Sequence, residues 1–295
     1  MKEAAVLMGY GSPDSKDEIY EYLVDVYGGR TPPDYAIRET EEKYSNFSYR
    51  SPSTGILNNL KEKIADDLRD QNMDVFLAFK HWKPSLQSIA KELSDKGYET
   101  VYALPLFPIE NRSVIESYVK PFSSYLQESG FEGNMKFTNG FQDCENLLYH
   151  WIEKCKAIGE DEDIVIFTAH SLPHDVRTEI EYYSKFVSLA GIISEKAGIE
   201  HWTYAFQSRG SYGKVWLEPS VYKRLDEIDF RNFKRLITVP IGFIYDHLEV
   251  LYDLDTVFGG KAREKGILYQ RVPLLNDTDS TVKMVKEKIE VMKNE

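Results

Sequence analysis

The strongest constraint on the fold is a series of short apolar runs, rich in Val, Ile, Phe and Tyr, that alternate with helical patterns. We expect strands at residues 4–10, 74–80, 100–107, 134–141, 163–170, 201–208, 235–243 and 266–273. The runs are dense in apolar residues and do not alternate at every second position, which is typical of strands covered on both faces. Strands that alternate with helices form βαβ units, so the sequence predicts an α/β fold with parallel sheets.

Other stretches have the features of helices. They are residues 56–71, 84–97, 121–130 and 279–295. In the first stretch the apolar residues recur at the spacing of one helical face. The last stretch begins with a Ser/Thr capping signal and is rich in lysine towards its end, which suits the helix dipole.

The second half of the chain resembles the first, which indicates a faint internal duplication. The segments VLMGYGS and VIFTAHS are each a strand that ends in a turn with Ser. We therefore expect two similar Rossmann-like domains, over residues 1–157 and 158–278, joined by the polar segment 156–163. In open α/β sheets ligands bind beyond the carboxyl ends of the strands. Two such domains predict an interdomain cleft as the binding site.

Composition excludes several classes of protein. The formal net charge is −12, whereas nucleic-acid binders carry a surplus of basic residues. The cysteines, Cys144 and Cys155, are too few for a disulfide framework or a four-thiolate metal site. No apolar segment approaches the length of a membrane span, so we expect a cytoplasmic protein. The aromatic fraction of 13% fits either an aromatic core or a cleft for a flat ligand.

The segment GYGSPD at residues 9–14 follows the first expected strand. It is similar to the start of a dinucleotide-binding fingerprint, but Asp14 stands where the third Gly or Ala would be. We therefore interpret the two glycines as a sharp turn after the strand. Tyr10 would then project from the strand end.

Two groups of candidate functional residues follow strands of the second half. His170 ends the run 163–170, where an imidazole can act as a metal ligand or a base, although a structural histidine is the alternative. If the segment after residue 243 is helical, Asp246, Glu249 and Asp253 share one face. Their mutual repulsion favours a bound cation, whereas acids at a helix start explain only the first two. A sparse site of His170 and Glu249 would hold a divalent metal weakly.

Several segments, in chain order, resemble the signature segments of ferrochelatases, which insert ferrous iron into a porphyrin in haem synthesis. They are LMGYGSP (7–13), GGRTPP (28–33), EKYSNFSYRSP (42–52), PIENRSVIESY (108–118), FTAHSLP (167–173), QSR (207–209), WLEPSV (216–221) and VPIGFIYDHLEVLYD (239–253). The resemblance covers nearly the whole chain.

The resemblance implies a fold of the class II chelatase kind, with the C-terminal helix 279–295 packed back on the first domain. It also implies that His170 and Glu249 handle the iron and accept pyrrole protons, supported by the acidic face of Asp246 and Asp253. Metallation must remove the pyrrole protons and deliver Fe²⁺ to the ring nitrogens, so it needs both a base and a loosely held metal. Fe²⁺ is then a substrate. No tightly bound cofactor is expected, because the family's optional iron–sulfur cluster needs more cysteines than this chain has.

The form GYGSP resembles the AYGTP of coproporphyrin ferrochelatases, in which the tyrosine can ligate the product iron. This implies coproporphyrin III as the porphyrin and Fe-coproporphyrin as the product. Separately, we expect the enzyme to be a monomer. The implied porphyrin contacts are Tyr10, Lys43, Tyr44, Ser51 and Tyr118.

Several alternatives stay open. They are a protoporphyrin IX ferrochelatase, a chelatase that inserts cobalt or nickel into a more reduced tetrapyrrole, and a porphyrin or haem carrier without catalysis. The sequence also departs from the coproporphyrin pattern in two places. Tyr27 stands where that branch commonly has a basic residue, and EIEYYSKF (179–186) occupies the region of a Gly-Asp-Pro-Tyr stretch.

Overall fold

The chain folds into two compact units, each built around one four-stranded sheet. The computed structural model describes residues 2–175, 178–209 and 215–294. Unit 1 comprises Met1–Leu106, Ser113–Asn139 and Asn276–Glu295, and unit 2 comprises Phe107–Arg112 and Gly140–Leu275. All neighbouring strands in both sheets are parallel. The predicted α/β class with parallel sheets is therefore confirmed.

The sheet of unit 1 has the strand order β2-β1-β3-β4. Its strands are β1 (Glu3–Gly9), β2 (Met73–Phe79), β3 (Thr100–Pro105) and β4 (Asn134–Phe137). The central strand β1 is fully buried from Ala4 to Met8, because it has a strand on each side and helices over both faces. Its continuous apolar run is what made this strand recognisable in the sequence.

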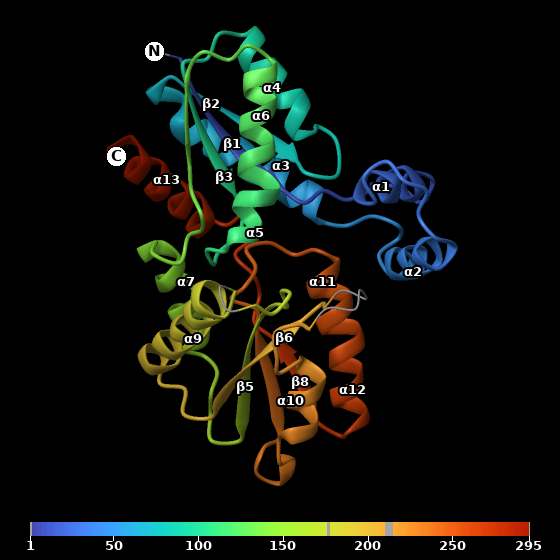
Figure 1. Cartoon of the computed structure of the whole chain (residues 1–295). Coiled ribbons are helices and arrows are strands. Elements are labelled where there is room, and N and C mark those ends of the chain that lie inside the picture. Colours follow the sequence, from blue (N-terminus) through green and yellow to red (C-terminus); the bar gives the residue numbers. More distant parts are fainter. Residues whose placement is uncertain (1, 176–177, 210–214, 295) are drawn as a thin grey trace. The chain divides into compact units, whose positions relative to one another are not determined.

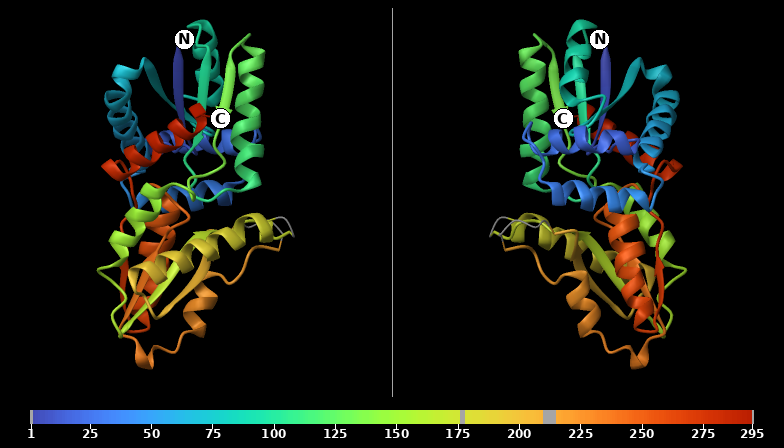
Figure 2. Two further views of the ribbon diagram at one scale, coloured as in Figure 1. Left: turned by 90° about the vertical axis from the view of Figure 1, so that its left-hand side faces the viewer. Right: turned by 90° about the vertical axis from the view of Figure 1, so that its right-hand side faces the viewer.

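The helical segments of unit 1 alternate with its strands along the chain. They are α1 (Ile19–Val26), α2 (Asp34–Ser45), α3 (Ser53–Leu68), α4 (Leu86–Asp95), α5 (Arg112–Val114), α6 (Lys120–Glu128) and α13 (Asp279–Asn294), with 3₁₀ turns at Lys16–Glu18 and Arg69–Gln71 and a π-helix η3 (Ile115–Val119). Helix α4 lies against α6, and α3 lies against α13, so the strands are enclosed between two helical layers (Figure 2). Helices α1 and α2 extend away from the sheet (Figure 1).

The sheet of unit 2 has the strand order β6-β5-β7-β8. Its strands are β5 (Asp163–His170), β6 (Trp202–Gln207), β7 (Arg235–Val239) and β8 (Leu268–Arg271). The helical segments are α7 (Glu145–Cys155), η4 (Glu179–Tyr183), α9 (Ser184–Ala197), α10 (Val221–Glu227), a 3₁₀ turn (Phe230–Asn232), α11 (Leu248–Val250), η6 (Leu251–Phe258) and α12 (Gly259–Glu264). The two sheets thus share one strand order, as the internal similarity of the sequence indicated.

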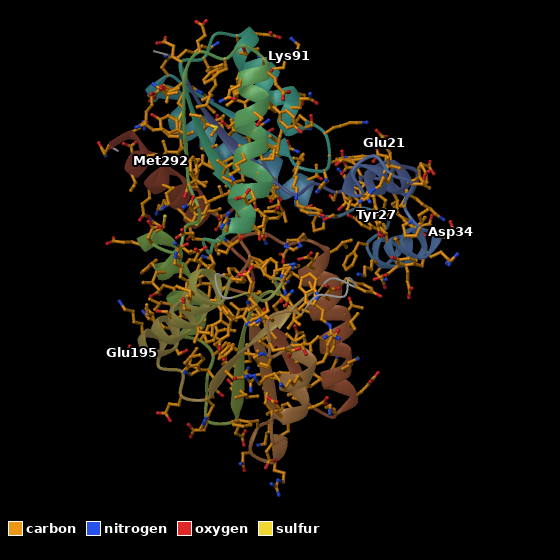
Figure 3. All side chains as sticks on the ribbon, in the orientation of Figure 1. Glu21, Tyr27, Asp34, Lys91, Glu195 and Met292 are labelled. Carbon is orange, nitrogen blue, oxygen red and sulfur yellow. The ribbon has the colours of Figure 1, made fainter. Side chains whose placement is uncertain are left out.

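The boundary between the compact units differs from the expected division after residue 157. Helix α7 packs on α9 and belongs to unit 2, because its buried face, which includes Leu147 and Trp151, needs that partner. The C-terminal helix α13 belongs to unit 1. There Lys136 Nζ donates to the carbonyl oxygen of Met292 at 2.6 Å, and Met292 is labelled on that helix in Figure 3.

Candidate functional site

His170 lies at the carboxyl end of β5, the inner strand of unit 2 that pairs with both β6 and β7. Its register partner is Gln207, the last residue of β6. The carbonyl oxygen of His170 accepts a hydrogen bond from the Tyr182 hydroxyl at 3.0 Å. Burial raises the pKa of Tyr182, so its hydroxyl stays a donor. The segment 179–186, which departs from the family pattern, therefore contributes a support for His170.

Gly242 brings a second segment to the same strand end. Its amide donates to the carbonyl oxygen of Thr168 at 3.0 Å. A Cβ atom at this position would lie only 2.5 Å from the Cα atom of Ala169, so no residue with a side chain can approach β5 this closely. The glycine of the VPIGF motif thus allows the chain after β7 to return towards His170.

This returning segment places Glu249 beside His170. The Nδ1 atom of His170 lies 3.0 Å from Oε2 of Glu249. Glu249 belongs to the single turn α11, which begins at Leu248 and continues directly into the π-helix η6. Both side chains are partly open to solvent, with exposed fractions of 33% for His170 and 44% for Glu249. The structure therefore brings the two predicted metal-handling residues together.

The surrounding charges act on the two histidines of the site in opposite directions. Burial alone would lower the pKa of His170, but the charge and hydrogen bond of Glu249, together with the charge of Asp253, outweigh burial and raise it. Burial lowers the pKa of His247, and the nearby carboxylates offset this only in part. The Nδ1 atom of His247 accepts from the Glu249 amide at 3.3 Å. His170 is thus a better proton acceptor than His247.

Two residues at the end of β6 hold the acidic segment. Gln207 Nε2 donates to the carbonyl oxygen of Glu249 at 2.7 Å, and the Ser208 hydroxyl donates to the carboxylate of Asp253. Both residues belong to the QSR segment (207–209) of the family resemblance. Asp253 lies on η6 one turn beyond Glu249, in keeping with its expected place near the site.

The expected helical stripe of three carboxylates is wrong in its first member. Asp246 precedes the helix, whose N-cap is His247, so it does not share a helical face with Glu249 and Asp253. Its Oδ1 atom lies 3.1 Å from Nη1 of Arg271. The expectation of a shared face required a regular α-helix from Asp246 onwards. Instead, the helix begins only at Leu248, and it continues as a π-helix from Leu251.

Few side chains at this site are placed to bind a metal. Within the described ranges 2–175, 178–209 and 215–294, no cluster of three or more His, Cys, Asp or Glu side chains has the arrangement of a metal site. Cys144 and Cys155 are both buried free thiols. An imidazole and a carboxylate suit a divalent first-row metal, and so small a donor set suits a metal that is handed on rather than kept.

In unit 1 a lysine links two of the predicted porphyrin contacts. Tyr10 follows β1 and is 40% exposed, whereas Tyr118 on η3 is only 2% exposed. Lys80, directly after β2, has its Nζ atom 5.8 Å from the ring centroid of Tyr10 and 5.4 Å from that of Tyr118. Burial lowers the pKa of Lys80, against the charge of Asp25. The carboxyl ends of β1 and β2 thus place Tyr10 beside Lys80, and the buried ring of Tyr118 on η3 lies near the same ammonium group.

The predicted contacts Tyr44 and Ser51 lie in a buried hydroxyl cluster of the same unit. Ser51 Oγ is 2.9 Å from Ser53 Oγ, which is 3.3 Å from Ser12 Oγ. Burial raises the pKa of Tyr44, and a hydrogen bond with Ser12 opposes that rise. Ser12 follows Gly11, whose φ of +98° and close approach to Trp82 explain the glycine in GYGSP.

Two other positions lie apart from this hydroxyl cluster. Lys43 on α2 pairs with Glu39 at 3.1 Å. Tyr27 is the C-cap residue of α1, in the helix pair α1–α2 that extends from the sheet (Figure 3). Its carbonyl oxygen accepts a hydrogen bond from Arg30 Nε at 3.0 Å.

Sequence reasoning missed Lys80, Tyr182 and Arg271. Lys80 is the last residue of the expected strand 74–80, so its strand-end position was the available signal. Tyr182 and Arg271 left no such signal, because their partners lie far away in the sequence.

The model of the ferrochelatase family matches residues 2–292. The chain belongs to the ferrochelatase family. It is thus a lyase that inserts a metal into a porphyrin in haem biosynthesis, and Fe²⁺ is a substrate rather than a resident cofactor. No helix in the described part of the chain is long and apolar enough to cross a membrane.

Individual relatives agree with this membership. A ferrochelatase of Thermoplasma acidophilum is 35% identical over 286 residues, which are 97% of this chain and 90% of the relative. A coproporphyrin III ferrochelatase of a Geobacillus species is 26% identical over 93% of both chains. The sirohydrochlorin chelatase of Bacillus subtilis subspecies spizizenii, solved with cobalt, shares the fold, with a TM-score of 0.58 at 10% identity over 100% of this chain and 97% of that one. The expected likeness to class II chelatases is thus confirmed.

Proposed function

We propose that this ferrochelatase inserts Fe²⁺ into coproporphyrin III, with His170 and Glu249 handling the metal and the pyrrole protons. The observation that carries the proposal is the pairing of His170 Nδ1 with Glu249 Oε2 at 3.0 Å, at the sheet edge where α/β folds bind ligands.

The pair can perform both parts of the reaction. As a neutral imidazole and a carboxylate, it offers a weak ligand set to incoming Fe²⁺. Metallation releases two pyrrole protons. As Fe²⁺ passes from His170 to the ring nitrogens, the imidazole takes one proton at Nε2, because Nδ1 is engaged with Glu249, and the other proton passes to water. The carboxylate then stabilises the imidazolium that forms. The raised pKa of His170 favours this transfer, because a stronger base accepts a proton more readily.

The choice of coproporphyrin III rests on unit 1. Tyr10 projects at the end of β1 and is 40% exposed, as the AYGTP resemblance implies for a ligand of product iron. A tetracarboxylate porphyrin also needs cationic and hydroxyl donors on a protein whose formal net charge is −12. Lys80, Lys43 and Ser51 would supply them locally.

Anaerobic metal insertion tests the proposal directly. Wild type receives Fe²⁺ with coproporphyrin III or protoporphyrin IX at equal concentration, and product absorption is followed. Porphyrin binding is measured separately by fluorescence. We expect faster turnover with coproporphyrin III, and we expect His170→Ala to bind porphyrin but lose insertion. His201→Ala is the matched control, because His201 is an exposed histidine just before β6. It lies at the amino ends of the strands, whereas His170 lies at a carboxyl end.

Three results would contradict parts of the proposal. Faster turnover with protoporphyrin IX would overturn the choice of porphyrin and leave the family reaction intact. Tight porphyrin binding without insertion by wild type would identify a carrier. Normal insertion by His170→Ala would remove His170 from the mechanism.

A further inference from the structure

A single guanidinium group bridges two carboxylates beside the site. Arg271, the last residue of β8, has an exposed side-chain fraction of only 12%. Its Nε atom lies 2.9 and 3.0 Å from the two carboxylate oxygens of Asp255. Its Nη1 atom lies 3.1 Å from Oδ1 of Asp246.

The two carboxylates bracket the segment that carries Glu249. Asp246 precedes the turn α11, and Asp255 lies within the π-helix η6 that follows it. Figure 1 shows α11 and α12 in line beside β8, with the π-helix between them. Arg271 forms ion pairs with both Asp246 and Asp255, so it can fix the start of this segment relative to its middle.

Asp255 has further partners that hold it in place. The Tyr269 hydroxyl donates to Asp255 Oδ1 at 3.3 Å, and this hydroxyl also lies 2.9 Å from Thr238 Oγ1. Arg263 Nη2 donates to the backbone carbonyl of Asp255 at 3.1 Å. Residues of β7 and β8 thus hold the π-helix through Asp255. Gln207 of β6 donates a hydrogen bond to the carbonyl oxygen of Glu249.

A π-helix needs such anchors more than an α-helix does. Its hydrogen-bond pattern is rare and is retained mostly at functional sites, so tertiary contacts must select it. A shift of about 1 Å in a reacting group can cost roughly 100-fold in rate. The Glu249 carboxylate lies in the turn that leads into this π-helix, and its place beside His170 depends on the register of that helix.

We propose that Arg271 is a positioning residue for metal insertion, which bridges Asp246 and Asp255 and so keeps Glu249 beside His170. This inference rests on the proposed role of Glu249. It assigns no contact with porphyrin or iron to Arg271, whose effect passes through the acidic segment.

The chain offers a matched control in the same sheet. Arg235 at the start of β7 makes a two-pronged pair with Asp163, in which Nε and Nη2 each lie 2.7 Å from a carboxylate oxygen. This pair lies at the amino edge of the strands, whereas Arg271 lies at the carboxyl edge. Removing either guanidinium breaks an arginine–aspartate pair, but only Arg271 touches the segment with Glu249.

The experiment compares Arg271→Met, Arg271→Lys and Arg235→Met, each alone and combined with Glu249→Gln. Insertion is expressed per porphyrin-binding site, so that loss of folded protein does not count as loss of rate. We expect Arg271→Met to lower kcat by about 10- to 100-fold with porphyrin affinity nearly unchanged. Arg271→Lys should fall between, because an ammonium cannot span both carboxylates as a guanidinium fork does. Arg235→Met should keep the wild-type kcat.

The combined variants separate positioning from a general structural role. If Arg271 acts through Glu249, Arg271→Met should cost little further rate once Glu249 is Gln, since coupled residues are not additive. A full additional loss in that background would overturn the proposal, and so would a wild-type kcat in Arg271→Met. A wild-type rate in Glu249→Gln alone would overturn the role of Glu249 and, with it, that of Arg271. If Glu249→Gln inserts iron slowly while Arg271→Met inserts it at the wild-type rate, only the positioning role of Arg271 would be overturned.

Discussion

The two sheets have the same strand order and parallel pairing, yet their carboxyl edges carry different chemistry. In unit 1 the edge presents Tyr10 and Lys80, with Tyr118 against the lysine. In unit 2 it presents the His170–Glu249 pair. The shared topology sets where functional residues can stand, and the side chains at the strand ends decide what each edge does.

This contrast suits a division of labour in a ferrochelatase. Rings and an ammonium group can hold a flat, acidic macrocycle, whereas an imidazole and a carboxylate can exchange metal and protons. Substitutions at the edge of unit 2 should therefore act on kcat, and those at the edge of unit 1 on porphyrin affinity.

The largest effect is expected at Glu249. Glu249→Gln keeps the size of the side chain but removes the charge that raises the pKa of His170. We expect kcat to fall by about 10²- to 10⁴-fold, the usual range for loss of acid–base catalysis, with porphyrin affinity nearly unchanged. Stopped-flow absorption would measure insertion, and fluorescence quenching would measure binding.

Glu195→Gln on α9 is the control for this change, because Glu195 lies on the exposed surface of the same unit (Figure 3). An unaltered insertion rate in Glu249→Gln would end the assignment of proton and metal chemistry to the edge of unit 2.

The amino edge of unit 2 should affect stability rather than rate. Hydrogen bonds from Arg235, against the effect of burial, hold the pKa of Asp163 below its usual value. A lowered pKa in the folded state stabilises the fold above the unfolded pKa of about 3.9. That contribution is lost as the pH falls through the folded pKa.

Asp163→Asn should therefore lower the free energy of unfolding near neutral pH by about 2 kcal/mol, less than for a fully buried pair because Arg235 is partly exposed. The difference from wild type should shrink as the pH falls through the folded pKa of Asp163. Urea unfolding across the acid range would measure it. A constant difference at every pH would show that the pair does not contribute through its charge.

At the edge of unit 1, Lys80→Met should weaken porphyrin binding. Loss of one charge-assisted contact of about 1.5 kcal/mol corresponds to about a tenfold rise in Kd, while kcat at saturating porphyrin stays near wild type. Lys91→Met, an exposed lysine on α4 paired with Asp95, controls for the loss of charge. A fall in kcat with unchanged Kd would place Lys80 in the reaction instead and break the proposed division.

Lys80 also shows where sequence reasoning stopped. Each of the eight strands in the described residues overlaps an expected strand. The inner strands β1, β3, β5 and β7 were the clearest, because their nearly continuous burial requires apolar runs that local composition reveals. Helices α1 and α2 were not predicted, since they extend from the sheet and bury few residues. The π-helix η6 was also missed, because periodicity arguments assume the α-helical repeat.

For the site, His170 and Glu249 could be named because each follows a strand and stands in a recognisable motif. Arg271 could not be named, because its partners are 16 residues away at Asp255 and still further at Asp246. Pairings of this kind depend on how β8 lies beside the acidic segment. That arrangement cannot be predicted from local sequence.

The smallest effect is expected at Tyr10. Tyr10→Phe removes only the hydroxyl and keeps the ring, whose centroid lies 4.8 Å from that of His81. A group that contacts only the product does not stabilise the transition state, so the insertion rate should stay within about twofold of wild type. The absorption spectrum of bound product should shift, because the proposed axial oxygen ligand is gone. Tyr35→Phe, an exposed tyrosine on α2, should leave both unchanged. Identical product spectra for wild type and Tyr10→Phe would remove Tyr10 as an iron ligand and limit the edge of unit 1 to holding the macrocycle.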